Sequence, residues 1–102
     1  MHTIQILLPI FNENGEAFPK EYYINLRNEF TEKYGGITAY TRSPASGFWK
    51  ENGEKTVKDD IIIYEIMADI LDKNWWQDCR KRLEHSFHQD EIIIRTWDIT
   101  LL

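Results

Sequence analysis

The sequence predicts an α+β domain of the ferredoxin-like type, with two helices on one face of a four-stranded antiparallel sheet. Apolar patterns follow one another as strand, helix, strand, strand, helix and strand, which is the βαββαβ order. The run from Asp59 to Ile70 is apolar on both faces except at Glu65, as expected of a central strand covered on two sides. Right-handed crossovers then place both helices on the same face of the sheet.

The first strand and helix are predicted from alternation followed by helical spacing. Residues 3–10 alternate, and the turn dipeptide Asn14-Gly15 follows them. Pro19 suits the first turn of a helix, and Gly35-Gly36 suits its end. The apolar stripe of this helix is Tyr23, Leu26, Phe30 and Tyr34.

The second and third strands are predicted to form a hairpin arm that overhangs the sheet. Ile37 to Arg42 reads as a strand, residues 43–47 interrupt it, and residues 48–50 resume an extended pattern. Asn52-Gly53 is a type I′ turn signal, so the chain is expected to reverse there and enter the Asp59 strand.

A second helix and a last strand complete the domain. Asp72 is a good N-cap, and an apolar stripe of Trp76, Cys79, Leu83 and Phe87 follows it. Residues 91–100 alternate as a strand. The side chains predicted to face the helices are Ile4, Ile6, Leu8, Ile37, Ala39, Ile62, Tyr64, Ile66, Ile92 and Ile94.

Composition limits the classes of function. With 102 residues and 42% hydrophobic content, we expect one domain spanning residues 1–102. Twelve Lys and Arg against seventeen Asp and Glu give a net charge of -5, which argues against nucleic-acid binding. A lone cysteine favours a reducing compartment, and no apolar run reaches the roughly 20 residues that span a bilayer. We therefore expect a soluble, cytoplasmic protein that does not bind membranes.

The common catalytic and metal-binding signatures are absent from the sequence. His85 and His88 stand three apart, but surface histidines near a helix end are the more ordinary interpretation. Cys79 lies on an apolar stripe, where thiols are usually inert. We predict neither a metal nor a cofactor, and no catalytic residue can be assigned.

The face of the sheet without helices is predicted to be largely apolar. It would carry Gln5, Leu7, Thr38, Tyr40, Arg42, Ile61, Ile63, Glu65, Met67, Ile93, Arg95 and Trp97. Soluble monomers usually expose only a few hundred Å² of contiguous apolar surface. A two-fold homodimer with sheets face to face is the simplest cover, since both copies carry the same patch.

The polar and aromatic residues of this face are the candidate ligand-binding site. They are Tyr40, Arg42, Glu65, Arg95 and Trp97, together with Trp49 on the hairpin arm. One interpretation is a cavity between two sheets, with aromatic walls and a charged group that orients a small molecule. The alternative is an interface ion pair of Glu65 with the two arginines that fixes the register of a dimer.

Several stretches of the sequence resemble a group of small bacterial proteins described only as hypothetical. They include residues 34–45, Gly47-Phe48-Trp49, Glu65-Ile66-Met67, Leu71-Asp72, Trp75-Trp76 and residues 89–92. This resemblance implies no activity. The predicted architecture is also similar to dimeric α/β-barrel proteins, some of which are monooxygenases or haem-handling enzymes, although no histidine falls on the predicted cavity face.

Two functions of different class follow. The first is a homodimer that binds a small molecule on the open sheet face, with monooxygenase-like catalysis as an option. The alternative is a protein-interaction module, for example a small acidic inhibitor or immunity protein that covers a basic partner. A purely structural assembly is a third option.

Overall fold

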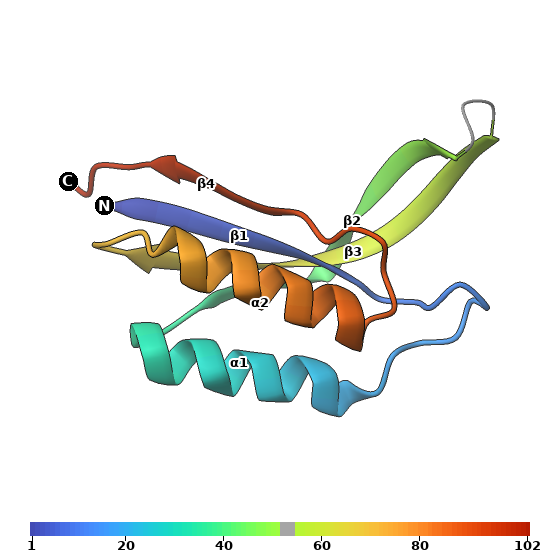
Figure 1. Cartoon of the computed structure of the whole chain (residues 1–102), viewed down its shortest axis with the longest axis horizontal. Helices are drawn as coiled ribbons and strands as arrows, with labels where there is room; N and C mark the ends of the chain where they lie inside the picture. The colour runs from blue at the N-terminus through green and yellow to red at the C-terminus, as the bar shows by residue number, and fades with distance from the viewer. Residues whose placement is uncertain (52–54) are drawn as a thin grey trace.

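The computed structural model describes the backbone of residues 1–51 and 55–102, and side chains outside residues 42–59. Within these residues the chain forms four strands and two helices in the predicted order (Figure 1). They are β1 (His2–Pro9), α1 (Lys20–Tyr34), β2 (Thr38–Glu51), β3 (Lys55–Ala68), α2 (Lys73–Ser86) and β4 (Ile94–Asp98).

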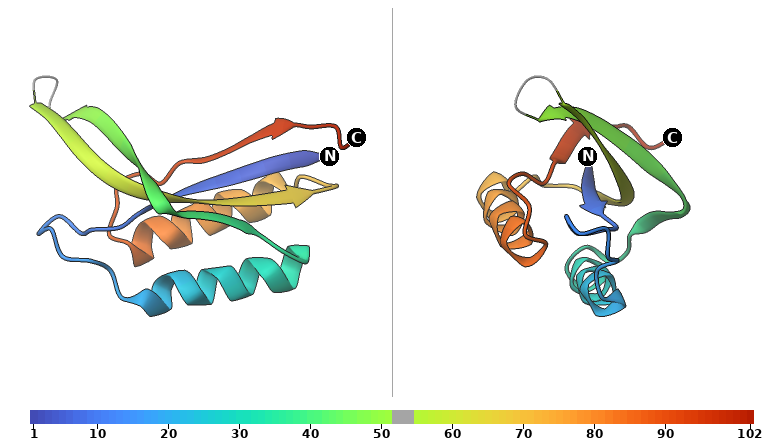
Figure 2. Two further views of the ribbon diagram at one scale, coloured as in Figure 1. Left: turned by 180° about the vertical axis from the view of Figure 1, so that it is seen from behind. Right: turned by 90° about the vertical axis from the view of Figure 1, so that its right-hand side faces the viewer.

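The sheet is antiparallel with strand order β2-β3-β1-β4, so β1 and β3 are central as predicted. Both helices lie on one side of the sheet, and its other side is free of helices (Figure 2). The ferredoxin-like α+β fold is therefore confirmed. We call the helix-free side the open face.

The core lies between the helices and the sheet. Ile4, Ile6 and Leu8 of β1 are fully buried there, and alternate residues of β3 pack beside them. Seven of the ten predicted helix-facing residues are buried, namely Ile4, Ile6, Leu8, Ile62, Tyr64, Ile66 and Ile92. Period-two alternation therefore assigned the faces of the central strands correctly.

The edge strands are less buried than the central strands. Ala39 lies on the helix side as predicted, opposite buried Tyr64, but it is exposed because β2 is an edge strand that the helices cover incompletely. Ile37 and Ile94 are only partly buried. The last strand is also shorter than the predicted residues 91–100, since regular pairing with β1 begins at Ile94.

The helix ends form as the sequence indicated. Gly35 adopts a left-handed conformation with φ of 85°, and its N–H donates to the carbonyl of Thr31. At the start of α2, the Asp72 carboxylate accepts a hydrogen bond of 3.0 Å from the N–H of Trp75. Gly35 therefore ends α1, and Asp72 marks the start of α2.

The β2–β3 hairpin forms the predicted arm. Pairing continues from Ala45↔Ile61 to Glu51↔Lys55, and a register shift between Tyr40 and Ala45 separates this segment from the main sheet. The arm extends past the ends of both helices (Figures 1 and 2). The predicted turn at Asn52-Gly53 lies outside the described residues.

Two tyrosine hydroxyls connect α1 to the central strands. Tyr23 donates to the carbonyl of Pro9 at the end of β1, and Tyr64 of β3 donates to the carbonyl of Tyr23 at 3.0 Å. Desolvation by burial, with a smaller repulsion from Tyr64, raises the pKa of Tyr23 to about 12. The helix is thus held to the sheet by side chains that must stay protonated.

This coupling predicts alkaline destabilisation. The unfolded pKa of tyrosine is about 10, so the contribution of Tyr23 is complete below pH 10 and is lost as the pH rises through about 12. Because the ring is partly exposed, we expect a loss on the order of 1 kcal/mol. Tyr23→Phe should lower stability at pH 7 and flatten the decline between pH 10 and 12 in urea unfolding curves.

Tyr22→Phe is the matched control. It removes a hydroxyl that makes no hydrogen bond within the described part of the chain. An alkaline decline that is identical in Tyr23→Phe and in the unmodified protein would contradict this assignment.

Candidate functional site

A row of four polar side chains crosses the open face, one from each strand. Thr38 of β2 lies opposite Glu65 of β3, Glu65 lies opposite Gln5 of β1, and Gln5 lies opposite Arg95 of β4. Residues directly opposite on antiparallel strands have Cβ atoms about 5 Å apart. The register of the sheet alone therefore brings these side chains together.

Hydrogen bonds join three members of this row, Arg95, Gln5 and Glu65. Arg95 Nε donates to Gln5 Oε1 at 3.0 Å, and Gln5 Nε2 donates to Glu65 Oε1 at 2.9 Å. From the other side, the Tyr40 hydroxyl donates to Glu65 Oε2 at 3.2 Å. Each oxygen of the carboxylate thus accepts one hydrogen bond from a neutral donor.

Arg95 acts on Glu65 indirectly. An ion pair of Glu65 with Arg95 was one interpretation of the sequence. In the structure Gln5 lies between the two side chains and accepts the hydrogen bond from the guanidinium group. Among the described side chains, therefore, Glu65 contacts no cation directly.

Apolar rows flank the polar row on both sides. Tyr40, Ile63 and Leu7 form one row, and Met67, Thr3 and Trp97 form the other. Tyr40 is 47% exposed, Met67 51% and Trp97 45%. A carboxylate between half-exposed aromatic and thioether side chains has the composition of a site for a ligand with a polar group on an apolar body.

Glu65 also perturbs the tyrosine beside it. Its negative charge, and then its hydrogen bond, raise the pKa of Tyr40 above the ordinary value. Tyr40 therefore remains a hydrogen-bond donor to Glu65 across the whole physiological pH range.

The predicted site residues divide into three groups. Tyr40, Glu65 and Arg95 meet in one network, and Trp97 lies on the same strand and face as Arg95. Arg42 and Trp49 belong to β2, but their side chains lie outside the described residues, and the pairing of Trp49 with Val57 places it in the arm.

Gln5 belongs to the network, although it was not among the candidate site residues predicted from the sequence. It was placed on the open face, but its position opposite both Glu65 and Arg95 depends on the register of three strands. Alternation indicates which face a residue occupies and leaves its cross-strand neighbour undetermined.

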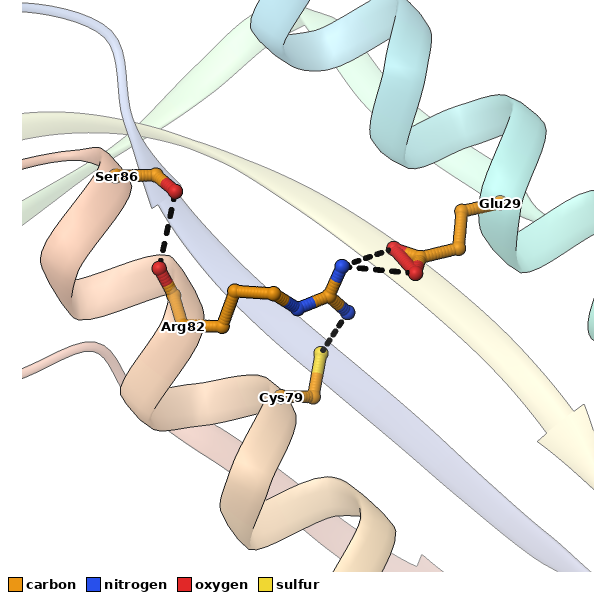
Figure 3. A network of polar contacts seen from close by, with 4 residues as sticks. All are labelled: Glu29, Cys79, Arg82 and Ser86. Carbon is orange, nitrogen blue, oxygen red and sulfur yellow. Dashed lines mark hydrogen bonds and ion pairs between the residues drawn. The ribbon is translucent and has the colours of Figure 1, made fainter.

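A cavity of about 540 Å³ lies elsewhere, between α1 and α2. Its lining includes buried Leu83 and Phe87, and Arg82 crosses it to bind Glu29 through Nη1 at 3.0 and 2.9 Å (Figure 3). This ion pair raises the pKa of Arg82. Its two charges already satisfy each other, so we interpret the pair as a bridge between the helices.

Cys79 and the potential metal-ligating side chains are the remaining chemically reactive groups. Cys79 is buried, and desolvation raises the pKa of its thiol, although Arg82 opposes this effect from 3.7 Å. The described residues hold no group of three or more His, Cys, Asp or Glu side chains that fits a metal ion. None of the described helices is long and apolar enough to cross a membrane.

Comparison with known proteins identifies similar structures only. No protein-family model matches the chain, and no curated protein matches it in sequence. The structure is similar to a phage SAM lyase in complex with S-methyl-5′-thioadenosine, with a TM-score of 0.65 and 13% identity over 95% of this chain and 80% of that chain. The apo state of a phage SAM lyase matches with a TM-score of 0.61 and 12% identity over 94% and 78% of the two chains.

At these identities the likeness concerns the fold, and it agrees with the ferredoxin-like architecture described above. Neither comparison tests the resemblance to the group of small bacterial proteins, which stays a prediction.

The Tyr40–Glu65 contact leads to a titration experiment. Glu65→Gln removes the charge and keeps a hydrogen-bond acceptor, so the pKa of Tyr40 should fall toward the ordinary value of about 10. The phenolate absorbance of Tyr40 is obtained by subtracting the titration of a Tyr40→Phe variant made in each background. Glu32→Gln, on the exposed surface of α1, is the control and should leave Tyr40 unchanged. A Tyr40 titration that Glu65→Gln does not alter would show that the two side chains do not interact in solution.

Proposed function

We propose that the open face of the sheet binds a small molecule whose cationic or hydrogen-bond-donating group meets Glu65. The observation that carries this proposal is the carboxylate itself, which accepts only from Gln5 and Tyr40 within the described residues. A carboxylate has about four acceptor sites, so Glu65 retains lone pairs for a ligand. Its negative charge favours a ligand that is positively charged at that point.

The composition around Glu65 supports an S-adenosyl sulfonium or a related thioether nucleoside as the ligand class. Aromatic faces attract cations, and Tyr40 and Trp97 lie close to the polar row on the same face. Flat purine rings also suit half-exposed aromatic and thioether surfaces. The fold is shared with a SAM lyase whose structure holds S-methyl-5′-thioadenosine, and this likeness supplies the class of ligand to test.

Catalysis is a further step of the same proposal. A base that removes a proton from the carbon next to the sulfur-bearing carbon allows a carbon–carbon double bond to form there. The carbon–sulfur bond breaks at the same time and its electron pair leaves on sulfur, so a neutral thioether is released without an oxidant. The described residues place Glu65 and Tyr40 where a ligand at this face would meet a base and a hydroxyl. We favour lyase chemistry over the monooxygenase-like activity suggested by architecture alone, because lyase chemistry uses only groups that this face carries.

A second copy of the chain is the cover that we propose for this face. Binding sites for small molecules usually bury most of the ligand surface, and one open sheet face leaves its ligand exposed on one side. Two copies with facing sheets would enclose the ligand and would also cover half-exposed side chains such as Met67 and Trp97.

Ligand binding is tested by calorimetry with two probes, S-adenosylmethionine and S-methyl-5′-thioadenosine. We expect both to bind and to raise the melting temperature, and we expect Glu65→Gln to weaken S-adenosylmethionine binding about tenfold or more, since it removes a charge at the site. Chromatography of the S-adenosylmethionine mixture would detect release of the thioether if the protein is a lyase.

Glu32→Gln on α1 is the matched control and should bind like the unmodified protein. Failure of both probes to bind would reject this ligand class. Equal binding by Glu65→Gln would reject the site. A protein partner that depends on Glu65, in the absence of any ligand effect, would favour the interaction-module alternative.

Association is tested by light scattering after size-exclusion chromatography. The chain has a mass of 12.2 kDa, and we expect about twice that value in solution. Met67→Asp on the open face should shift the protein toward the monomer, because it buries a charge in the proposed interface. Ile70→Asp, at an 80% exposed position beyond the end of β3, is the control. A monomer at high concentration would exclude the face-to-face dimer.

A further inference from the structure

We infer that Gln5, oriented by Arg95, is a positioning residue that keeps Glu65 directed at a cationic or hydrogen-bond-donating ligand group. This inference rests on the proposed function, because it concerns how the same site selects its ligand. It assigns a role to two side chains that need not touch the ligand themselves.

The orientation of the Gln5 amide is dictated by the chemistry of its neighbours. A guanidinium offers only donors and a carboxylate offers only acceptors, whereas an amide has one end of each kind. Arg95 Nε donates to Oε1 of Gln5 at 3.0 Å, so Nε2 of Gln5 must face Glu65. It donates to Oε1 of Glu65 at 2.9 Å. The reversed amide would place two donors against each other at Arg95 and two oxygens against each other at Glu65.

The backbone makes this arrangement rigid. Gln5 lies on the central strand β1, with Glu65 directly opposite on β3 and Arg95 directly opposite on β4. The backbone positions of Gln5 and Glu65 are held by the sheet register, since the opposite faces of β1 and β3 form the buried core. The three side chains therefore extend from adjacent backbone positions on the same face.

Glu65 is restrained at both oxygens as a result. Gln5 holds Oε1 and Tyr40 holds Oε2, which fixes the plane of the carboxylate. A preoriented acceptor loses less conformational entropy when a ligand binds. If Arg95 is removed, the Gln5 amide loses one of its two hydrogen bonds, so it restrains Oε1 of Glu65 less firmly.

If Arg95 acted only through its positive charge, its removal would strengthen the binding of a cation, whereas loss of its positioning role would weaken it. The two effects have opposite signs, so the inference is testable. Arg95 lies two strands from Glu65, about 10 Å at the usual strand spacing. Removing a positive charge at that distance should tighten the binding of a cation by up to about twofold in an aqueous environment. Loss of positioning should weaken it.

The experiment compares Arg95→Met and Gln5→Met with the unmodified protein, using S-adenosylmethionine as the cationic probe and S-methyl-5′-thioadenosine as the neutral one. We expect each variant to weaken S-adenosylmethionine binding roughly fivefold to tenfold, the effect of one lost hydrogen bond. We expect a smaller effect on the neutral probe. Arg95→Lys, which keeps a charged donor, should restore part of the affinity.

Matched surface variants control for general effects. Arg80→Met and Gln77→Met change the same residue types at exposed positions of α2 and should leave both affinities unchanged. Tighter or unaltered S-adenosylmethionine binding by Arg95→Met would overturn the inference. The positive charge of Arg95, and not its hydrogen bond to Gln5, would then determine the affinity.

A second measurement separates this inference from the proposed function. The side-chain amide signals of Gln5 in nitrogen–proton NMR spectra report its hydrogen bonds without any ligand. We expect one amide proton to be shifted downfield in the unmodified protein and to lose part of that shift in Arg95→Met, where the amide is less restrained, and in Glu65→Gln, where the acceptor is neutral. If neither probe binds while this pattern is seen, the proposed ligand class fails and the positioning network stands. If the Gln5 amide signals are unchanged in both Arg95→Met and Glu65→Gln, the positioning role is overturned.

Discussion

The register of β1 against β3 is the constraint on which the rest of the structure depends. With Ile4 opposite Ile66 and Gln5 opposite Glu65, one face of the central pair is apolar and the other is polar at its middle. A slip of one residue would exchange these faces and place Gln5 in the core. The core thus specifies the geometry of the candidate site, although the two lie on opposite sides of the sheet.

The central strands were predictable from the sequence because each of them carries its own pattern. Alternation assigned Ile6 and Tyr64 to the helix side and Glu65 to the open side, and the structure agrees on all three. Alternation also assigned Ala39 correctly to the helix side, opposite Tyr64, but it did not predict that Ala39 is exposed, because burial on an edge strand depends on how far the helices reach across the sheet. That distance is a property of packing between segments far apart in the chain.

The candidate site was predictable as a set of residues and unpredictable as a network. Tyr40, Glu65 and Arg95 stand out as polar or aromatic residues in apolar strands, and the structure brings them together. Gln5 gives no such signal, since a glutamine on a half-exposed strand is unremarkable. Its importance arises only when three strands align, and local sequence patterns do not determine that alignment.

The interposed glutamine also explains how an acidic site persists beside an arginine. A direct ion pair between Glu65 and Arg95 would occupy the acceptor positions of the carboxylate, as the pair of Glu29 and Arg82 does between the helices. The Gln5 amide accepts from Arg95 on one side and donates to Glu65 on the other, so it keeps the two charged groups apart. Among the described side chains the open face therefore combines a restrained carboxylate with a negative charge that no cation contacts, as the proposed site for a cationic ligand group requires.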